Sequence, residues 1–268
     1  ADLATRMVVK MTSLQGTMGR EYARLAGEPP AVADAIYEHW LPRFADDAVP
    51  ASKAGTLLAL LDRLDSLVGL FGVGLAPKST ADPYGLRRAA LGIIQILTEQ
   101  RIDLDLSAAV RVSADAQPIS VSLDAKAQVL DFITGRLRVW LGEQGWATDI
   151  VNAALAAQPG NPYRALINVQ QLSEWVSSDG WIKVLDSFAR CVRITRGEPE
   201  QYKVDESLFV QQEERDLYLA YKQASHLLTD GIDIDTFLSS FAPMVPVVSK
   251  FFGEEPGKGV LVNTDDQA

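Results

Sequence analysis

The feature that most constrains the fold is the spacing of apolar residues between Ser52 and Phe71. Large apolar residues recur there every three or four positions, which places them on one face of an α-helix. That face consists of Leu57, Leu61, Leu64, Val68 and Phe71. The glycine-rich stretch that follows, together with Pro77, would end the helix. A long helix with one apolar face needs other helices to cover that face, so the pattern predicts a helical core.

Most of the remaining chain has the same spacing. It predicts further helices over residues 3–14, 30–40, 83–97, 124–142, 148–157, 163–176, 181–195, 205–228 and 233–252. Pro243 and Pro246 would interrupt the last of these, because proline does not fit a regular helix interior. Residues 104–123 differ, since their apolar residues alternate with polar ones around Pro118. A hairpin and an irregular connector fit this stretch equally well, and the sequence does not decide among strand, loop and helix there.

The helical spacing also predicts which side chains face the core. The residues expected to face inward are Leu3, Met7, Met11 and Leu14, then Val32, Ile36 and Trp40, then Leu86, Ala90, Ile93 and Leu97, then Leu130, Ile133, Leu137 and Trp140 or Leu141, and finally Leu217, Tyr221 and Leu228. The predicted fold class is therefore mostly α, with a domain boundary between residues 124 and 183.

The composition limits the class of protein further. Apolar residues make up 47% of the 268 residues and charged residues 22%, which is enough to bury a core and argues against disorder. The longest apolar stretch contains three charged residues, so we expect no membrane span. Cys191 has no cysteine partner, and His39 and His226 are too few for a histidine metal centre. We therefore expect a cytoplasmic protein in a reducing environment.

The net charge of −10 argues against general coating of nucleic acid, which requires basic side chains to displace counterions from phosphates. The charge is uneven, however. Residues 205–268 hold 4 basic and 12 acidic residues, which leaves 21 basic and 23 acidic residues for the first 204. Two stretches, 78–101 and 183–203, are locally basic, so any contact with a polyanion is expected there.

The first basic stretch carries three candidate binding residues, Lys78, Arg87 and Arg88. We expect a helix to begin near Asp82-Pro83, with the acidic residue as its N-cap and the proline at its first position. The two arginines would then lie in the first turns, beside exposed backbone amides, which suits a phosphate or a carboxylate. Salt bridges within the domain are an equally good interpretation.

The second basic stretch carries Arg190, Arg193 and Arg196, which recur every three residues and would line one side of their helix. Such a ridge binds the backbone of a nucleic acid or stays solvated. The two flanking arginines would lower the pKa of Cys191, but no histidine is near it in the sequence to complete a nucleophile.

A metal-dependent enzyme is the main rival interpretation. His39 on one helix, with Asp62 and Asp65 on the next, would hold a divalent ion as in HD-type phosphohydrolases. Those sites need a His-Asp doublet and further histidines, and Glu38-His39-Trp40 has no doublet. We therefore predict no metal site and no catalytic residue. A helical protein-interaction module is a second alternative.

Five stretches together suggest a family. They are Ala1 to Val8, Leu14 to Ala23, Ala35 to Arg43, Leu60 to Gly69 and Ser79 to Ala90, with a further match at Val204 to Phe209. In sequence and in order, these resemble the beta subunit of bacterial glycyl-tRNA synthetase. The resemblance is dense over the first 100 residues and weak in the middle of the chain.

The resemblance implies an HD-like helical domain over 1–123, a helical connector over 124–182 and a truncated anticodon-binding-like helical domain over 183–268. It implies a non-catalytic, tRNA-binding part of a class II glycine–tRNA ligase. The alpha subunit, or a fused alpha portion, would activate glycine with ATP and Mg²⁺, and this chain would hold no cofactor. The expected partners are tRNA(Gly) and the alpha part, with neither DNA nor a membrane. Lys78, Arg87 and Arg88 would contact the acceptor side, and Arg190, Arg193 and Arg196 the anticodon arm.

Overall fold

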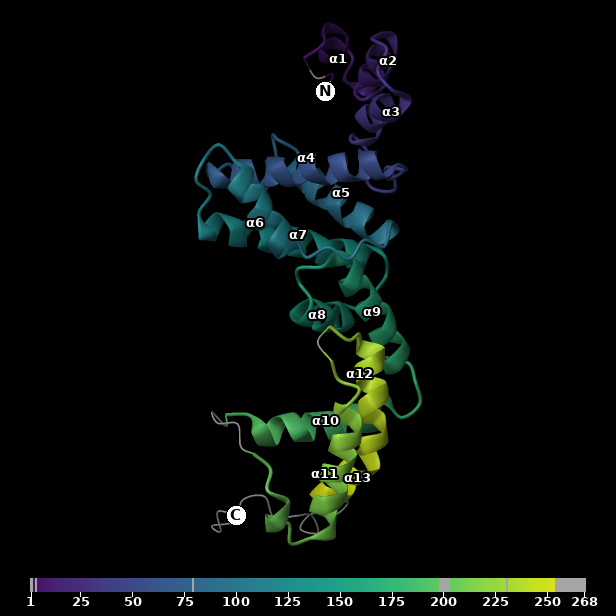
Figure 1. Cartoon of the computed structure of the whole chain (residues 1–268), viewed down its shortest axis with the longest axis vertical. Helices are drawn as coiled ribbons and strands as arrows, with labels where there is room; N and C mark the ends of the chain where they lie inside the picture. The colour runs from purple at the N-terminus through teal and green to yellow at the C-terminus, as the bar shows by residue number, and fades with distance from the viewer. Residues whose placement is uncertain (1, 3, 79, 198–202, 230, 254–268) are drawn as a thin grey trace. The chain divides into compact units, whose positions relative to one another are not determined.

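The protein is built from helices, as the sequence predicts. The computed structural model describes residues 2, 4–78, 80–197, 203–229 and 231–253 (Figure 1). These residues form α-helices joined by loops and short 3-10 turns, and no strand occurs among them, which confirms the mostly α class. None of the helices in the described ranges is long and apolar enough to cross a membrane.

The chain divides into two compact units, residues 1–169 and 170–268. The helices that begin in the first unit are α1 (Arg6–Lys10), α2 (Thr17–Leu25), α3 (Pro30–Glu38), α4 (Lys53–Gly72), α5 (Leu86–Glu99), α6 (Leu106–Ala116), α7 (Leu123–Glu143), α8 (Thr148–Ala157) and α9 (Pro162–Val176), within which the division falls. The second unit contains α10 (Trp181–Thr195), α11 (Gln212–Ser225), α12 (Ile234–Phe241) and α13 (Val245–Phe252). The assignment of these units to an HD-like domain and an anticodon-binding-like domain stays a prediction.

The core of the first unit forms around α4 and α5. Helix α4 packs against α3, α5, α6 and α7, and α5 also packs against α7 (Figure 1). The predicted inward face of α5 is confirmed, because each of its members is fully buried: Leu86, Ala90, Ile93 and Leu97. Burying one such large apolar side chain contributes about 1.5–3 kcal/mol. These two helices therefore form the frame to which the other elements of the unit attach.

A buried arginine joins α4 to the end of α3. The Arg63 side chain is 7% exposed. Its Nη1 donates to the carbonyls of His39 and Ala59 at 2.9 and 3.0 Å, and its Nη2 to those of Leu41 and Pro42 at 2.9 and 3.0 Å. Burial lowers the pKa of Arg63 to about 10, so the group stays charged at neutral pH. The carbonyls at the end of α3 carry the negative end of the helix dipole, which favours this cation.

The partner helix leaves space for this guanidinium. Gly92 of α5 lies so close to Arg63 that a Cβ atom at this position would overlap the arginine Nε. A glycine is therefore required at the contact for steric reasons. Helices α3, α4 and α5 thus meet at one buried cation.

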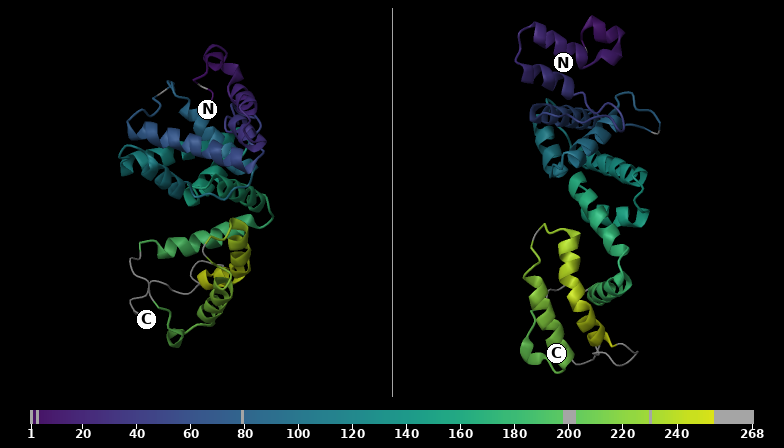
Figure 2. Two further views of the ribbon diagram at one scale, coloured as in Figure 1. Left: turned by 45° about the horizontal axis from the view of Figure 1, so that its top comes forward. Right: turned by 90° about the vertical axis from the view of Figure 1, so that its right-hand side faces the viewer.

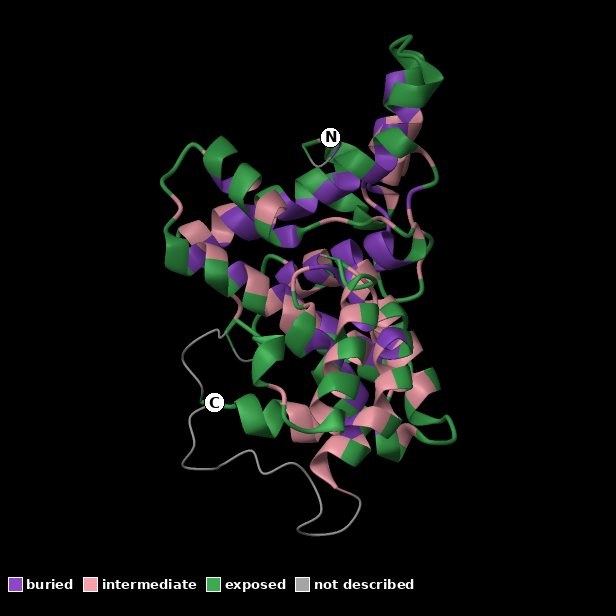
Figure 3. Ribbon diagram, turned by 60° about the horizontal axis from the view of Figure 1, so that its bottom comes forward, coloured by how far each residue is buried: buried purple, intermediate pink, exposed green. Residues whose placement is uncertain are grey.

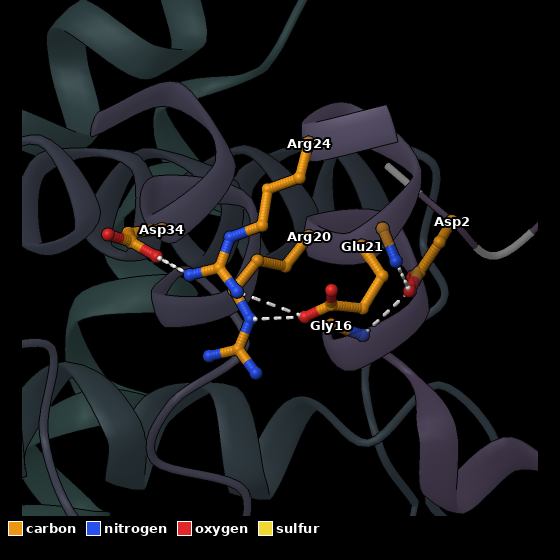
Figure 4. Close-up of polar contacts among 7 residues, drawn as sticks. Asp2, Gly16, Arg20, Glu21, Arg24 and Asp34 are labelled. Carbon is orange, nitrogen blue, oxygen red and sulfur yellow. Dashed lines mark hydrogen bonds and ion pairs between the residues drawn. The ribbon is translucent and has the colours of Figure 1, made fainter. Parts of the chain in front are cut away.

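A second buried charge, that of Asp2, lies at the start of α2. The Asp2 carboxylate is 2% exposed and accepts hydrogen bonds from the amides of Gly16 and Gly19, at 2.8 and 2.7 Å, at the start of α2 (Figure 4). A carboxylate is favourable there because the first amides of a helix have no partner within the helix. Two of the stretches that suggest the family therefore meet in one structural contact.

An ion-pair network covers the exposed side of α2. Arg24 pairs with Glu21 and with Asp34 of α3, at 3.2 and 3.0 Å (Figure 4). These pairs are exposed, so each contributes at most about 1 kcal/mol.

Several predicted core faces are wrong in detail. Leu57 and Leu61 are 60% and 53% exposed, although the rest of the α4 stripe is buried. Helix α4 packs on α5, α6 and α7, and its buried leucines are Leu60, Leu64 and Leu67. Met7, Met11 and Val32 are likewise exposed, and the residues buried in those segments are Val8, Ala33 and Ala35.

The sequence leaves strand, loop and helix open for residues 104–123, and the structure shows a helix, α6, over Leu106–Ala116. Asp105 caps α6 by accepting from the Ser107 amide at 2.8 Å. The buried residues of α6 are Leu106, Val110 and Ala114, spaced by four. Val112, which produced the apparent alternation, is 65% exposed. In this part of the stretch, the apparent alternation of apolar and polar residues thus came from Val112, an exposed valine on a short helix.

The second unit has a thin core. Its buried hydrophobic residues within the described ranges are Val184, Ala224, Leu238 and Val248. Figure 3 colours the described residues by burial, with buried positions in purple. Helix α13, yellow in Figure 2, contacts α10 and α11, which are green. The ring of Phe188 makes edge-to-face contacts with the rings of Phe237 and Phe241 on α12, at centroid distances of 5.8 and 5.5 Å.

The predicted helix over 205–228 is shorter in the structure. Helix α11 begins at Gln212, because the Glu214 carboxylate accepts from the amides of Val210 and Gln211 and so forms a capping box. Tyr221 and Leu228, predicted to face inward, are 53% and 39% exposed.

The Arg63 contact generates a stability prediction. Arg63→Leu leaves the buried carbonyls of His39, Leu41 and Pro42 without their donor, and each unsatisfied group costs about 1–3 kcal/mol. We expect the free energy of unfolding, measured by urea denaturation, to fall by about 3 kcal/mol or more. The matched control Arg24→Leu removes only exposed ion pairs and should cost about 1 kcal/mol or less. Equal losses in the two variants would contradict the structural role of Arg63.

Candidate nucleic-acid interface

The predicted basic residues of the first unit lie at the entrance to α5. Lys78 is exposed in a tight turn closed by two backbone hydrogen bonds with Ala81, at 3.2 and 2.9 Å. Arg87 and Arg88 are the second and third residues of α5, the former half-buried and the latter exposed. Arg88 makes no hydrogen bond or ion pair with the residues that the structure describes, so its donors are available to a ligand.

The start of α5 differs from the prediction. The helix begins at Leu86, after Gly85 in the left-handed conformation with φ +67°, and not at Pro83. The Asp82 carboxylate reaches forward and accepts from the amides of Leu86 and Arg87, both at 2.9 Å. The first amides of the helix are therefore occupied, and the expected anion site on exposed amides is wrong. A phosphate here would bind the guanidinium groups instead.

A cavity of about 160 Å³ opens beside Arg88. Eleven residues line it, from the segment after α3, from α4 and from the start of α5. Three of them are arginines, namely Arg43, Arg63 and Arg88, against the single carboxylate of Asp62. A chain with a net charge of −10 thus has a locally cationic hollow at its predicted binding site.

The three arginines of this cavity differ in their partners. Both Nη atoms of Arg63 donate hydrogen bonds to backbone carbonyls. Arg43 pairs with Asp47 through its Nε, at 2.7 Å; this hydrogen bond raises the pKa of Arg43 and lowers the pKa of Asp47. Arg88 lines the cavity and makes no hydrogen bond or ion pair with the described residues. We name the group formed by Arg43, Arg63, Arg87, Arg88 and Lys78 the arginine cluster.

Two aromatic residues of the cavity were missed by sequence reasoning. Trp40 and Tyr84 line it together with the arginines. The sequence pattern predicts Trp40 on a core stripe and Tyr84 in the first turn of a helix. The signal that points to them is an aromatic residue within a few positions of an arginine on each of two segments, Trp40 with Arg43 and Tyr84 with Arg88.

The second basic group lies at the end of α10. Arg190 and Arg193 share one partner, Asp186, at 3.0 and 3.7 Å. Arg196 is exposed and lies just beyond the helix, in extended backbone. The three arginines therefore do not form a continuous ridge on one helix. The ion pairs with Asp186 are exposed and weak, so a phosphate competes for both guanidinium groups.

Burial, and not the neighbouring arginines, controls Cys191. The thiol is half-buried, and burial raises its pKa, contrary to the expected lowering. A raised thiol pKa disfavours the nucleophilic thiolate at neutral pH.

The residues of the rival metal site are not brought together. The His39 Nδ1 lies 2.6 Å from the Ile36 carbonyl within its own helix end. The Asp65 carboxylate accepts from the Gln117 Nε2 at 2.6 Å. No group of three histidine, cysteine or acidic side chains in the described part of the chain could hold a metal ion. The HD-type phosphohydrolase hypothesis therefore has no structural support in these residues.

Comparison with known proteins decides the family. Residues 1–156 match the family model described as "Glycyl-tRNA synthetase beta subunit". The chain belongs to this family. The resemblance seen in the sequence is confirmed.

Named relatives share the whole length of the chain. It is 38% identical to the glycine–tRNA ligase beta subunit of Myxococcus xanthus, over all of this chain and 39% of that protein. The corresponding protein of Persephonella marina is 34% identical over 99% of this chain and 39% of its own length. Glycine–tRNA ligase, chloroplastic/mitochondrial 2, of Arabidopsis thaliana is 35% identical over 94% of this chain and 24% of its own length. The chain thus spans about two fifths of the bacterial beta subunits that it matches.

Proposed function

We propose that this chain binds tRNA(Gly) as the non-catalytic, tRNA-holding part of a glycine–tRNA ligase. Membership of the beta subunit family supports the choice of substrate. The observation that carries the proposal is the arginine cluster, of which Arg43, Arg63 and Arg88 line one cavity of a chain with a net charge of −10. Such a cluster attracts phosphate backbone, and binding by phosphate contacts sets the register and orientation of the RNA.

The contribution of this chain to aminoacylation would be positional. Lys78, Arg87 and Arg88 would hold backbone on the acceptor side of the tRNA. Arg190, Arg193 and Arg196 would contact the anticodon arm, after exchange of Asp186 for phosphate. A bound substrate held in the correct orientation reacts faster because part of the entropy of encounter has already been lost. The alpha part, with ATP and Mg²⁺, would carry out the chemistry in the cytoplasm.

Charge removal at α5 tests this proposal. In Arg87→Ala/Arg88→Ala we expect weaker tRNA(Gly) binding and a plot of log affinity against log salt that is flatter by roughly 2. The control Lys10→Ala/Arg111→Ala removes the same charge from exposed positions on α1 and α6 and should leave the slope unchanged. The measurement is fluorescence anisotropy of labelled tRNA at four salt concentrations. Equal slopes for the wild-type chain and the α5 variant would contradict the assignment.

We also propose that the alpha part of the enzyme binds an apolar surface of this chain. A groove of about 1020 Å³ lies between α4 and α6, and its walls include the exposed side chains of Leu57, Leu61 and Val112. An adjacent hollow shares Leu57 and Leu61 and extends to Val32 of α3. Exposed apolar surface of this extent is typical of protein–protein contacts and gives little attraction for phosphate.

Replacing two leucines of the groove tests the protein contact. Leu57→Ser/Leu61→Ser should weaken capture of the alpha part about tenfold or more. It should leave tRNA binding unchanged, because both side chains are exposed and uncharged and neither lines the cavity of the arginine cluster. Leu25→Ser/Leu123→Ser, which changes two leucines that are more than 80% exposed and line neither hollow, is the control. Surface plasmon resonance with immobilised alpha part gives both affinities. Unchanged capture by the groove variant would reject this contact.

A further inference from the structure

The cavity beside Arg88 has the size of a site for one small planar group. Its volume of about 160 Å³ corresponds to roughly five water molecules at about 30 Å³ each. It is formed by three separate segments, namely the residues after α3, the outer face of α4 and the start of α5. The carbonyl contacts of Arg63 hold the first two of these segments together, and α5 packs against the same guanidinium through Gly92. The cavity is therefore part of the folded frame.

Aromatic rings line this cavity on two of the three segments. Tyr84, on the loop before α5, is 54% exposed, and Trp40, after α3, is half-buried. Exposed tyrosine at the mouth of a cationic hollow has no role in the core. Unstacked RNA bases bind by stacking on such rings and on guanidinium planes.

The polar groups of the cavity have the pattern that a base requires. Arg88 offers donors, and the Ser66 hydroxyl donates or accepts. The Asp62 carboxylate is an acceptor that receives no hydrogen bond and forms no ion pair among the described residues. A carboxylate in this position accepts from an amino group and repels a carbonyl oxygen. Cytosine, adenine and guanine carry an exocyclic amino group, and uracil does not.

From this arrangement we propose that the cavity binds a single unstacked nucleobase of the RNA, with its amino group at Asp62, its ring on Tyr84 and the adjoining phosphate at Arg88. The inference rests on the proposed tRNA binding and makes it more specific, because it adds readout of a base to contacts with the backbone. Phosphate contacts alone carry no sequence information, whereas a base held in this way does.

Oligonucleotides with and without bases test the proposal. The probes are a ten-nucleotide oligocytidylate, an oligouridylate of the same length and an abasic ribose-phosphate decamer of the same charge, with affinity for the 268-residue chain measured by fluorescence anisotropy. We expect the oligocytidylate to bind about tenfold more tightly than the abasic decamer, in line with one aromatic stacking contact. Tyr84→Ala should abolish that preference and leave the affinity for the abasic decamer unchanged. Tyr22→Ala, at an exposed tyrosine of α2, should keep the preference.

A second pair of variants tests the amino-group contact. The wild-type chain should prefer oligocytidylate to oligouridylate, and Asp62→Ala should remove this preference. Asp65→Ala, one turn further along α4, should retain it.

The failures of the two proposals are distinguishable. Equal affinity of the wild-type chain for the oligocytidylate and the abasic decamer overturns the base site, and so does a preference that survives Tyr84→Ala; in both cases backbone binding stands. Absence of binding to both decamers and to tRNA(Gly) overturns the proposed function itself.

Discussion

The buried guanidinium of Arg63 is the interaction on which the architecture of the first unit depends. It is a charged group from the middle of α4 that replaces its water with four backbone carbonyls from α4 and the end of α3. Removing a charge from water is costly, and only a nearly complete set of hydrogen bonds compensates for it. The planar fork of arginine supplies the directions that two separate pairs of carbonyls require, which a lysine does not. Gly92 then allows α5 to pack against the same group.

This one contact also explains where the candidate site lies. The segment that Arg63 holds contains Trp40 and Pro42, and the helix that packs on Arg63 begins with the residues Leu86 to Arg88. Those two segments and α4 form the walls of the cationic cavity. The buried Arg63, bound to carbonyls, and the exposed Arg88 thus line the same cavity. The proposed site for a polyanion therefore requires only local positive charge, in a chain that is acidic overall.

Sequence reasoning predicted the elements of the fold better than their faces. The ranges of α8 and α10 agree with the prediction to the residue, since glycine and proline mark their ends clearly. The faces were less predictable, because an amphipathic stripe does not say which neighbour covers it. Leu57 and Leu61 continue the stripe of α4 but line an open groove. The partners of the charged side chains were hardest to predict. Arg63 and Asp82 form hydrogen bonds with backbone carbonyls and amides, and the sequence does not indicate such partners. The candidate arginines could be named from their spacing, but Trp40 and Tyr84 required the folded structure to bring their segments together.

Ultraviolet crosslinking of the intact chain to tRNA(Gly), followed by mass spectrometry of the crosslinked peptides, tests the central claim most directly. The claim is that the cavity built on Arg63 forms the RNA contact surface of the first unit. It predicts crosslinks within residues 40–43 and 78–88, with Tyr84 among the modified side chains. Crosslinks in the first unit that avoid both segments and fall elsewhere, for example on α1 or α7, would contradict it.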